Sequence, residues 1–302
     1  MTVQVVTGAS GFTGKYIARR LLDRGDEVRT ITGHPGRPGP FGDRVRAYPF
    51  SFEDPSRLVE ALRGASVLYN TYWVRFSRGA STFDAAVNNT RTLIRAAEEA
   101  GIERIVHVSI TNPSETSSLP YFRGKALLER AIRESSLSHA ILRPAVIFGD
   151  EDVLINNIAW LLRRFPLFVV PGLGEYRLQP IYVDDMAELA VSCGESRDNV
   201  TIDAIGPDTF SFNELVALLK DTVASRARIV HLPPRVALAL SRVVGVVVRD
   251  VVLTPDEVDG LLADLLVTQS PPAGKTRLAD WLREHRDTIG KRYASELAKH
   301  FR

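Results

Sequence analysis

Hydrophobic residues in the first half of the chain recur with two alternating periods. Short runs rich in β-branched side chains alternate with longer segments whose apolar positions return every three or four residues. The first pattern predicts buried strands and the second predicts amphipathic helices. The predicted strands are Val3–Thr7, Glu27–Thr32, Val45–Tyr48, Val67–Asn70, Arg104–Ser109 and His139–Leu142. The predicted helices are Gly14–Asp23, Pro55–Leu62, Ser81–Ala100 and Tyr121–Glu134.

Several predicted strands are almost entirely apolar, as in Ile105–Val108. Strands of this kind are typical of a parallel sheet that helices cover on both faces. Regular alternation of strand and helix predicts an α/β fold with a doubly wound parallel sheet, the Rossmann fold. We assign residues 1–148 to this domain and expect residues 184–204 to return to it.

Beyond Gly149 the alternation weakens. The pattern predicts a helix near Val153–Arg164, a strand at Leu178–Val183, a helix from Asp184 and a strand at Val200–Ala204. The remainder is mostly helical in pattern. We therefore expect residues 149–183 and 205–302 to form a smaller, mostly helical lobe that binds the substrate.

Composition narrows the possible partners. The 302 residues carry 38 basic and 36 acidic side chains, a formal net charge of +2, and no basic arm of five or more consecutive charges. This balance gives no support to a nucleic-acid partner. Cys193 is the single cysteine, which excludes an intrachain disulfide and a cysteine-rich metal centre. We expect a cytoplasmic protein with a small-molecule substrate and no metal.

The most apolar tract is Val236–Val252, which Arg242 and Arg249 interrupt. It is shorter than the roughly 20 apolar residues that a membrane-spanning helix needs. The N-terminus also lacks the pattern of a signal peptide. We predict no transmembrane segment and interpret Val236–Val252 as a buried helix, with attachment to a membrane surface or a partner as the alternative.

A glycine triplet follows the first predicted strand. Gly8, Gly11 and Gly14 stand in the segment Thr7–Gly14, at the turn that opens the first helix. At this place in such sheets the helix N-terminus and backbone N–H groups bind a dinucleotide's pyrophosphate. We expect Ser10, Phe12 and Thr13 to contribute to the same contact. The alternative is a tight turn without a ligand.

The loop after the second strand bears on the choice between NAD and NADP. An NAD site has an acidic residue here that binds the ribose hydroxyls, whereas an NADP site needs a cation for the 2′-phosphate. No acid occurs between Gly33 and Pro40, while Thr32, His34 and Arg37 offer a hydroxyl and two basic groups. This favours NADP, unless the loop is only solvated.

Tyr121 and Lys125 stand four residues apart, so a helix places both on one face. A tyrosine with a free-solution pKa near 10 needs a neighbouring cation before it can act as an acid or base at neutral pH. Thr111, or else Ser109, follows the fifth strand and can donate a second hydrogen bond to a carbonyl oxygen. Each hydroxyl can alternatively cap the turn.

Together with Arg143–Gly149 and Gln179–Ala187, these motifs resemble the extended or atypical short-chain dehydrogenase/reductases, a group that includes NAD-dependent epimerases and dehydratases. The helix from Tyr121 to Glu129 and the C-terminal helices resemble the branch that contains the nucleotide-binding accessory subunit of respiratory complex I.

The resemblance implies roles for particular residues. Gly8, Gly11 and Gly14 would hold the pyrophosphate, Tyr121 would be the general acid/base, and Lys125 would bind the nicotinamide ribose. Pro144 would lie against the nicotinamide, and Thr111 matches the family's catalytic Ser/Thr. We also expect cofactor contacts from the residues at the ends of the third and fourth strands: Ser51, Asn70 and Thr71.

The sequence departs from the family pattern at three places. Ser51 replaces an expected Asp at the adenine-binding turn, Ser109-Ile110-Thr111 replaces a serine pair, and the fourth strand ends in aromatic residues instead of small ones. Of that aromatic segment, Tyr72, Trp73 and Arg75 are candidate substrate contacts that would form one wall, with the rings for stacking and the arginine for an anion. Asn156 and Asn157 are candidate polar contacts from the second lobe. The alternative for the aromatic residues is packing in the protein interior.

These features predict an NAD(P)-dependent oxidoreductase that acts on a carbonyl or alcohol of a small molecule. Two alternatives remain: a non-catalytic NADPH-binding protein with a structural or redox-sensing role in an assembly, and a nucleotide-sugar epimerase or dehydratase. By analogy with the family, a homodimer would form through Ser81–Ala100 and Tyr121–Glu134.

Overall fold

The computed structural model describes residues 2–295 and 297. The chain folds into two compact units, and each is described here by itself. The first contains residues 2–144 and 183–204, and the second contains residues 145–182 and 205–295.

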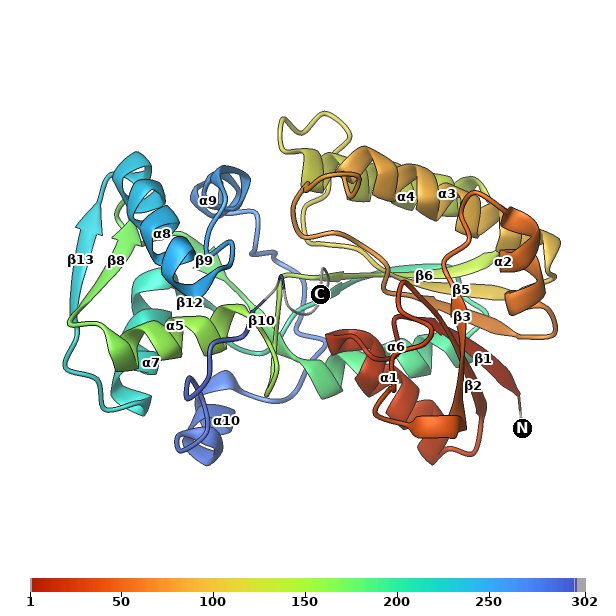
Figure 1. The fold of residues 1–302 in the computed structure, drawn as a ribbon, viewed down its shortest axis with the longest axis horizontal. Coiled ribbons are helices and arrows are strands. Elements are labelled where there is room, and N and C mark those ends of the chain that lie inside the picture. The colour runs from red at the N-terminus through yellow and green to blue at the C-terminus, as the bar shows by residue number, and fades with distance from the viewer. Residues whose placement is uncertain (1, 296, 298–302) are drawn as a thin grey trace. The chain divides into compact units, whose positions relative to one another are not determined.

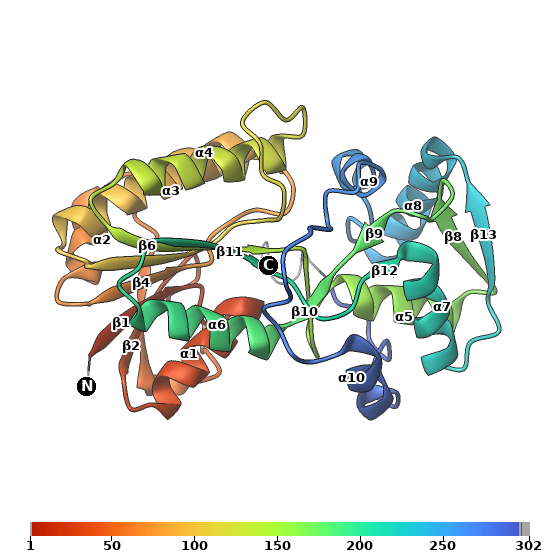
Figure 2. The same cartoon turned by 180° about the vertical axis from the view of Figure 1, so that it is seen from behind.

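A seven-stranded parallel sheet forms the centre of the first unit (Figures 1 and 2). Its strands, in the order β11-β6-β5-β4-β1-β2-β3, are Val200–Ala204, Ser138–Pro144, Arg104–Val108, Val67–Asn70, Val3–Thr7, Glu27–Thr32 and Val45–Pro49. The chain therefore winds outward in one direction from β1 to β3 and in the other from β4 to β11. This order is that of a Rossmann fold, and the predicted doubly wound sheet is confirmed.

Helices cover both faces of this sheet. On one face α1 (Phe12–Asp23) packs against α6 (Val183–Glu195), and on the other α3 (Phe83–Glu99) packs between α2 (Pro55–Leu62) and α4 (Pro120–Glu134). A short 3-10 turn, Gly42–Arg44, precedes β3. Side chains such as Leu68 and Ile105 are fully buried, and each contributes about 2 kcal/mol of hydrophobic stabilisation. Burial on both faces explains why the strand sequences are nearly continuous runs of apolar residues.

The second unit is mainly helical. Its helices are α5 (Leu154–Arg164), α7 (Phe212–Thr222), α8 (Pro234–Val248), α9 (Pro255–Leu262) and α10 (Leu278–His285). Three two-stranded sheets accompany them: β7 (Val146–Phe148) with β10 (Pro180–Tyr182), β9 (Arg177–Leu178) with β12 (Phe210–Ser211), and β8 (Leu167–Pro171) with β13 (Arg228–Leu232). Its core includes Phe148, Ile155, Leu215 and Trp281.

One prediction for the second unit is wrong. The tract Val236–Val252, interpreted as a buried helix, corresponds largely to α8, in which only Ala237 and Gly245 are buried. The physical reason is that α8 covers a sheet of only two strands, which is too small to bury more than a narrow face of the helix. Among the described residues, no helix is both long enough and apolar enough to cross a membrane.

Candidate nucleotide-binding site

The carboxyl ends of β1 and β4 are locked together by hydrogen bonds. The Thr71 N–H donates to Thr7 Oγ1 over 2.7 Å, and the Thr71 hydroxyl donates to the Thr7 carbonyl over 2.6 Å. Between these two strands the winding direction of the sheet reverses. Ligands of doubly wound sheets bind at this reversal, so the lock fixes the floor of the candidate site.

The glycine-rich turn between β1 and α1 requires glycine at two positions, for different reasons. Gly8 has φ +67°, a left-handed conformation that L side chains rarely adopt. A Cβ at Gly14 would lie 2.3 Å from the Gly8 carbonyl oxygen, so the first turn of α1 contacts the backbone of the turn directly. The α1 N-terminus starts at Gly11 without a side-chain cap and has no acid in its first turn. Its N–H groups and dipole therefore favour an anion.

The loop after β2 folds back toward this turn. A Cβ at Gly39 would lie 3.0 Å from Ser10 Oγ, which places the loop beside the glycine-rich turn. Inside the loop, the His34 N–H donates to Thr32 Oγ1 over 3.3 Å, and the Arg37 N–H donates to the His34 carbonyl. The side chains of His34 and Arg37 are exposed. His34 and Arg37, two of the predicted phosphate-binding residues, thus lie on one short turn of a loop whose Gly39 approaches Ser10.

The two aromatic residues predicted to form one wall belong to two separate clusters. Tyr72 packs on Phe50 and Phe52, with ring centroids 4.8 and 5.3 Å away, and these two phenylalanines flank Ser51. Trp73 instead contacts Tyr121, with centroids 5.7 Å apart. Neighbouring residues in an extended segment point to opposite sides, which explains the division.

Arg75, the third predicted residue of this wall, is half-buried. Its guanidinium carbon lies 5.9 Å from the Phe76 ring centroid. This contact with its chain neighbour describes how the side chain is held, and the predicted substrate contact stays a prediction.

Lys125 is buried on α4, with only 2% of its surface exposed. Its Nζ donates to the Val108 carbonyl over 2.7 Å and lies 4.6 Å from the centroid of the Trp73 ring. Burial lowers the pKa of Lys125 to about 7, against a smaller opposing effect of Glu129. The ammonium form is held by one carbonyl and one aromatic face, which compensate only part of the lost hydration.

Tyr121 stands one turn before Lys125, at the start of α4. It lies edge-on to Trp73 and to Phe83, whose ring centroid is 5.9 Å away. The close fit of Trp73 depends on Gly124, because a Cβ there would lie 2.8 Å from the indole ring. The predicted tyrosine and lysine therefore share one aromatic environment.

The two candidate hydroxyls after β5 differ in their surroundings. Ser109 donates to Glu129 Oε1 over 2.6 Å, so its hydroxyl is committed to a buried carboxylate. Thr111 is also buried, and its N–H donates to the Pro144 carbonyl over 3.0 Å. That bond joins the loop after β5 to the end of β6.

Glu129 is a structural residue of the site that the sequence analysis missed. Both of its oxygens accept hydrogen bonds from Arg143, one of them over 2.9 Å, and Arg133 adds an ion pair. Burial alone raises the pKa of this carboxyl, but the bonds from Arg143 and Ser109 outweigh it and lower the pKa. Glu129 and Arg143 thereby anchor α4 to β6. The sequence did offer a signal for this ion pair. It places an acid on the same side of the helix as Tyr121 and an arginine inside a buried strand.

His107 was missed as well. Asn70 Oδ1 accepts from the Tyr72 N–H, so Asn70 Nδ2 faces His107 Nδ1 at 3.0 Å and donates to it. The proton of the neutral ring then resides on Nε2, a buried atom without a hydrogen-bond partner among the described residues. Burial, with a smaller effect from the Lys125 charge, lowers the pKa of His107 well below its usual value. This neutral histidine orients Asn70 at the end of β4.

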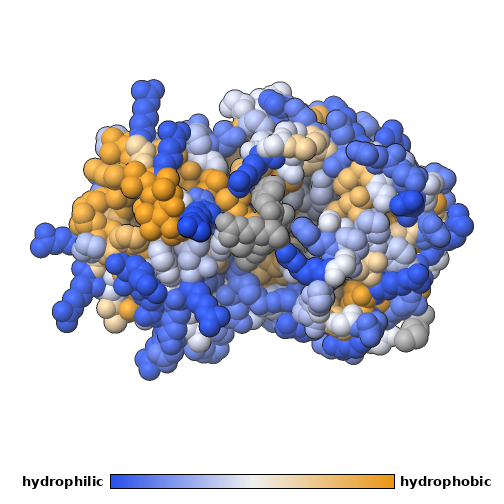
Figure 3. All heavy atoms as spheres, viewed as in Figure 1, coloured by the Kyte–Doolittle hydropathy of each residue, from blue (hydrophilic) through white to orange (hydrophobic). Residues whose placement is uncertain are grey.

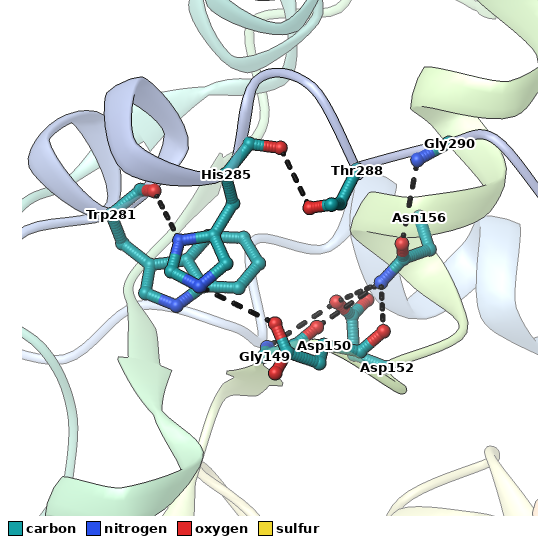
Figure 4. A network of polar contacts seen from close by, with 8 residues as sticks. All are labelled: Gly149, Asp150, Asp152, Asn156, Trp281, His285, Thr288 and Gly290. Atoms are coloured by element: carbon teal, nitrogen blue, oxygen red, sulfur yellow. Dashed lines mark hydrogen bonds and ion pairs between the residues drawn. The ribbon is translucent and has the colours of Figure 1, made fainter.

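Asn156 and Asn157, the predicted contacts from the second lobe, are buried within the second unit. Asn156 Nδ2 donates to Asp152 Oδ2 over 2.9 Å and to the Gly149 carbonyl over 3.1 Å (Figure 4). Asn157 exchanges two hydrogen bonds with the backbone of Ala294. Both amides thus hold backbone segments of this unit together.

The same network contains a buried acid, Asp152. It accepts hydrogen bonds from the N–H groups of Ile155 and Gly149, and burial raises the pKa of its carboxyl to about 7. Nearby, His285 stacks on Trp281 and lies 3.5 Å from an Asp150 oxygen (Figure 4). These contacts join the loop after β7 to α10.

Comparison with known proteins identifies the class. Residues 8–157 match the NAD(P)H-binding family of proteins. A mitochondrial relative from Arabidopsis thaliana, subunit 9 of the NADH dehydrogenase [ubiquinone] 1 alpha subcomplex, is 27% identical over 89% of this chain and 71% of its own length.

Two solved structures share the fold. Triphenylmethane reductase from a Citrobacter species has a TM-score of 0.75 at 19% identity and covers 95% of this chain and 100% of its own. UDP-glucose 4-epimerase from Thermotoga maritima has a TM-score of 0.66 at 20% identity, with 77% and 86% covered. The chain is thus an NAD(P)-binding protein with the epimerase/dehydratase-like fold of the extended short-chain dehydrogenase/reductases. Within that class it is homologous to the complex I subunit, as its motifs predict.

Proposed function

We propose that this chain is an NADP(H)-dependent oxidoreductase that acts on a carbonyl or alcohol group of a small molecule. The observation that carries the proposal is the set of groups that follow the carboxyl ends of β1, β4 and β5. These groups are the glycine-rich turn, the hydrogen bonds between Thr7 and Thr71, and the face of α4 that carries Tyr121 and Lys125. All of them lie at the carboxyl-end edge of the same parallel sheet. A dinucleotide site and a proton donor are therefore available on the same side.

The residues present fit a dinucleotide. The uncapped, acid-free N-terminus of α1 and the bare turn at Gly8 suit a pyrophosphate. Two buried donors without a partner among the described residues belong to rings near Lys125: Trp73 Nε1, in the ring that Lys125 Nζ faces, and His107 Nε2, in the ring whose pKa the Lys125 charge helps to lower. Unpaired buried donors are rare in folded proteins and are a feature of sites that receive an acceptor.

Within this proposal, each residue has one task. Bound NADPH supplies the hydride that reduces the carbonyl carbon. Tyr121 gives its phenolic proton to the carbonyl oxygen, which becomes the alcohol, and then regains a proton from solvent. Thr111 donates a hydrogen bond to the same oxygen, since Ser109 is committed to Glu129. Lys125, one helical turn from Tyr121, would bind the nicotinamide ribose.

Replacing Tyr121 with Phe tests the catalytic role. We expect NADPH oxidation with a panel of aldehydes and ketones to fall about 100-fold, as is typical when a general acid is removed. The Kd for NADPH, measured by calorimetric titration, should change less than about threefold, because the ring remains to pack against Trp73 and Phe83. Unchanged turnover in this variant would remove Tyr121 from the mechanism.

Replacing Arg37 with Glu tests the preference for NADP(H). We expect the Kd for NADPH to rise at least about tenfold, since a cation for the 2′-phosphate is exchanged for an anion, while the Kd for NADH stays within about threefold. Arg63→Glu is the matched control: it makes the same charge change at an exposed residue between α2 and β4, at the opposite edge of the sheet. An equal loss of affinity for NADPH and NADH would mean that Arg37 acts through its general charge and not through the 2′-phosphate.

A second candidate function is non-catalytic binding of NADPH within an assembly. Two observations favour this second function: the Trp73 ring covers Lys125, and the pKa of Lys125 is low. A lysine that is half neutral at pH 7 stabilises a tyrosine phenolate poorly. The relatives named as subunits of a respiratory complex add support. For this function we expect tight NADPH binding, no turnover with any carbonyl, and a Tyr121→Phe variant that behaves like the parent protein.

The proposal also covers the compartment in which the protein resides and the proteins with which it associates. A protein with a buried, unpaired Cys193 fits a reducing compartment, and we assign the chain to the cytoplasm on that ground. By analogy with its class, self-association would use the faces of α3 and α4, whereas the second candidate function requires a different protein as partner.

A further inference from the structure

The large hydrophobic side chains that are exposed in this protein are concentrated in one segment. Among the described residues, all of them fall between Phe165 and Leu262, in the second unit. Single exposed apolar residues are ordinary, but a concentration of this kind marks a surface that contacts something other than water. Figure 3 displays it as an orange area over α8 and β8.

Helix α8 supplies the greater part of this surface. Its exposed apolar side chains are Val236, Leu240, Val243, Val246 and Val247. Four of them recur at intervals of four, three and four residues and so form one row along the helix. Val246 and Val247 are 79% and 71% exposed, although both stand near the centre of an apolar sequence. We call this row, together with Val246, the α8 face.

Neighbouring elements extend the α8 face. The helix packs on β8, where Leu167 is exposed. Leu173 follows β8 and is exposed, and a Cβ at the adjacent Gly172 would lie 3.4 Å from Leu262 of α9. Three elements thus present aliphatic side chains on this unit.

Arginines border the α8 face. Arg235 and Arg242 are exposed and stand seven residues apart, on the side of the helix next to the apolar row, and Arg249, also exposed, is the C-cap that follows α8. Residues 234–249 contain no Asp or Glu. None of the three arginines has a salt bridge or side-chain hydrogen bond among the described residues. Helix α8 and its C-cap therefore carry only cationic charges, whereas the acidic residues Asp256, Glu257 and Asp259 belong to α9.

From this arrangement we infer that the α8 face docks the protein on an anionic lipid surface. Aliphatic side chains enter the boundary between headgroups and acyl chains, and the three arginines contact the phosphate groups. The 15 residues of α8 give a length of about 22 Å, which suits a helix that lies in the plane of the interface.

Two other occupants fit this face less well. The residues that contribute most of the binding energy in protein interfaces are enriched in Trp, Tyr and Arg, whereas Leu and Val, which dominate here, are under-represented among them. A second copy of the chain in a two-fold arrangement would bring the arginines of one α8 toward those of the other, with no acid on either helix. Charge complementarity therefore favours the lipid.

Sedimentation with vesicles tests the inference on the whole protein. One set contains 30% phosphatidylglycerol in phosphatidylcholine, and the other contains phosphatidylcholine alone. We expect binding to the anionic vesicles, weakened by high salt, and at least about fivefold less binding to the neutral ones. The double variant Val243→Gln/Val247→Gln and the triple variant Arg235→Gln/Arg242→Gln/Arg249→Gln should each lose at least about fivefold.

A second triple variant, Arg57→Gln/Arg283→Gln/Arg286→Gln, is the control. It removes the same charge from three exposed arginines elsewhere and should bind like the parent protein. The valines and arginines of α8 are exposed, so circular dichroism of every variant should match the parent. If both triple variants lose vesicle binding equally, or if the valine variant binds fully, vesicle binding depends only on the protein's total charge. Either outcome overturns the inference. No vesicle binding by the parent, or a dimer in solution that the valine variant abolishes, assigns the α8 face to a protein partner instead.

Discussion

Replacing Gly14 with Ala is expected to lower the affinity for NADPH at least about 1,000-fold, equal to about 4 kcal/mol of binding free energy. The added methyl group would lie 2.3 Å from the Gly8 carbonyl oxygen and 3.2 Å from the Thr7 carbonyl oxygen. All these neighbours are backbone atoms, so relief requires α1 to move away from the turn. The turn and the helix N-terminus contact the pyrophosphate together, and their separation removes several contacts at once. Calorimetric titration with NADPH measures the effect.

The same substitution should also reduce stability. In a helix Ala is favoured over Gly by about 1 kcal/mol, which would stabilise α1 if nothing else changed. Forcing a methyl group against backbone costs more than this, and we expect a net loss of about 2 kcal/mol in the free energy of unfolding by urea. Gly36→Ala is the matched control, because its Cβ would meet nothing within 4 Å. A Gly14 variant that binds and unfolds like this control would disprove the close contact between α1 and the turn.

Local patterns were enough to predict the sheet and the glycine-rich turn that follows its first strand. A strand buried on both faces and a helix with one apolar face have different periods, and Gly8, Gly11 and Gly14 satisfy steric demands of a single turn. These features depend on residues close in sequence. For the same reason the strand boundaries agree within one or two residues for most elements, β6 being extended by Arg143 and Pro144.

The sequence did not predict which side chains meet across the site. Tyr72 and Trp73 were expected to act together, but their alternation along an extended segment sends them to different clusters. Likewise, the partners of Ser109 and His107 come from other strands and helices, Glu129 and Asn70. Such contacts depend on the packing of distant segments, for which a single sequence offers no period.

The burial of α8 was misjudged for a related reason. An apolar helix in a sequence predicts that some surface will cover it, but it does not say whether that surface belongs to the same chain. In this unit the sheet beneath α8 has two strands, and the outer face of the helix stays exposed. The vesicle experiment asks what covers it.

Replacing Lys125 with Met is expected to have opposite effects on stability and on function. Burial lowers the pKa of this lysine from its ordinary value near 10.5 to about 7 in the folded protein, so folding below pH 7 desolvates a full charge. A shift of this size corresponds to roughly 4–5 kcal/mol. Met fills a similar volume but leaves the Val108 carbonyl without its donor, which costs about 1–2 kcal/mol. We therefore expect Lys125→Met to stabilise the nucleotide-free protein by roughly 3 kcal/mol at pH 6.

The pH dependence distinguishes this cause from better packing. Between pH 7 and about 10.5 the unfolded chain binds a proton at Lys125 that the folded protein has released, so the stability of the parent protein rises with pH in this window. The advantage of the Met variant should therefore be constant below pH 7, shrink as the pH rises, and reverse before pH 10.5, where only the cost of the unpaired Val108 carbonyl, about 1–2 kcal/mol, remains. Urea unfolding of both proteins at several pH values measures the difference between their free energies of unfolding. The contributions of all other titrating groups cancel in this difference. Lys291→Met, at an exposed residue, should change stability by less than about 0.5 kcal/mol at every pH.

Function should change in the other direction. Without Lys125 the nicotinamide ribose loses its proposed contact and Tyr121 loses the amine one helical turn away, so turnover should fall at least about 1,000-fold. A protein that becomes more stable as it loses activity would identify Lys125 as a residue kept for its chemistry at a cost to the fold. If instead Lys125→Met lowers stability at pH 6, the amine is not desolvated in the folded protein, and its burial under Trp73 is wrong.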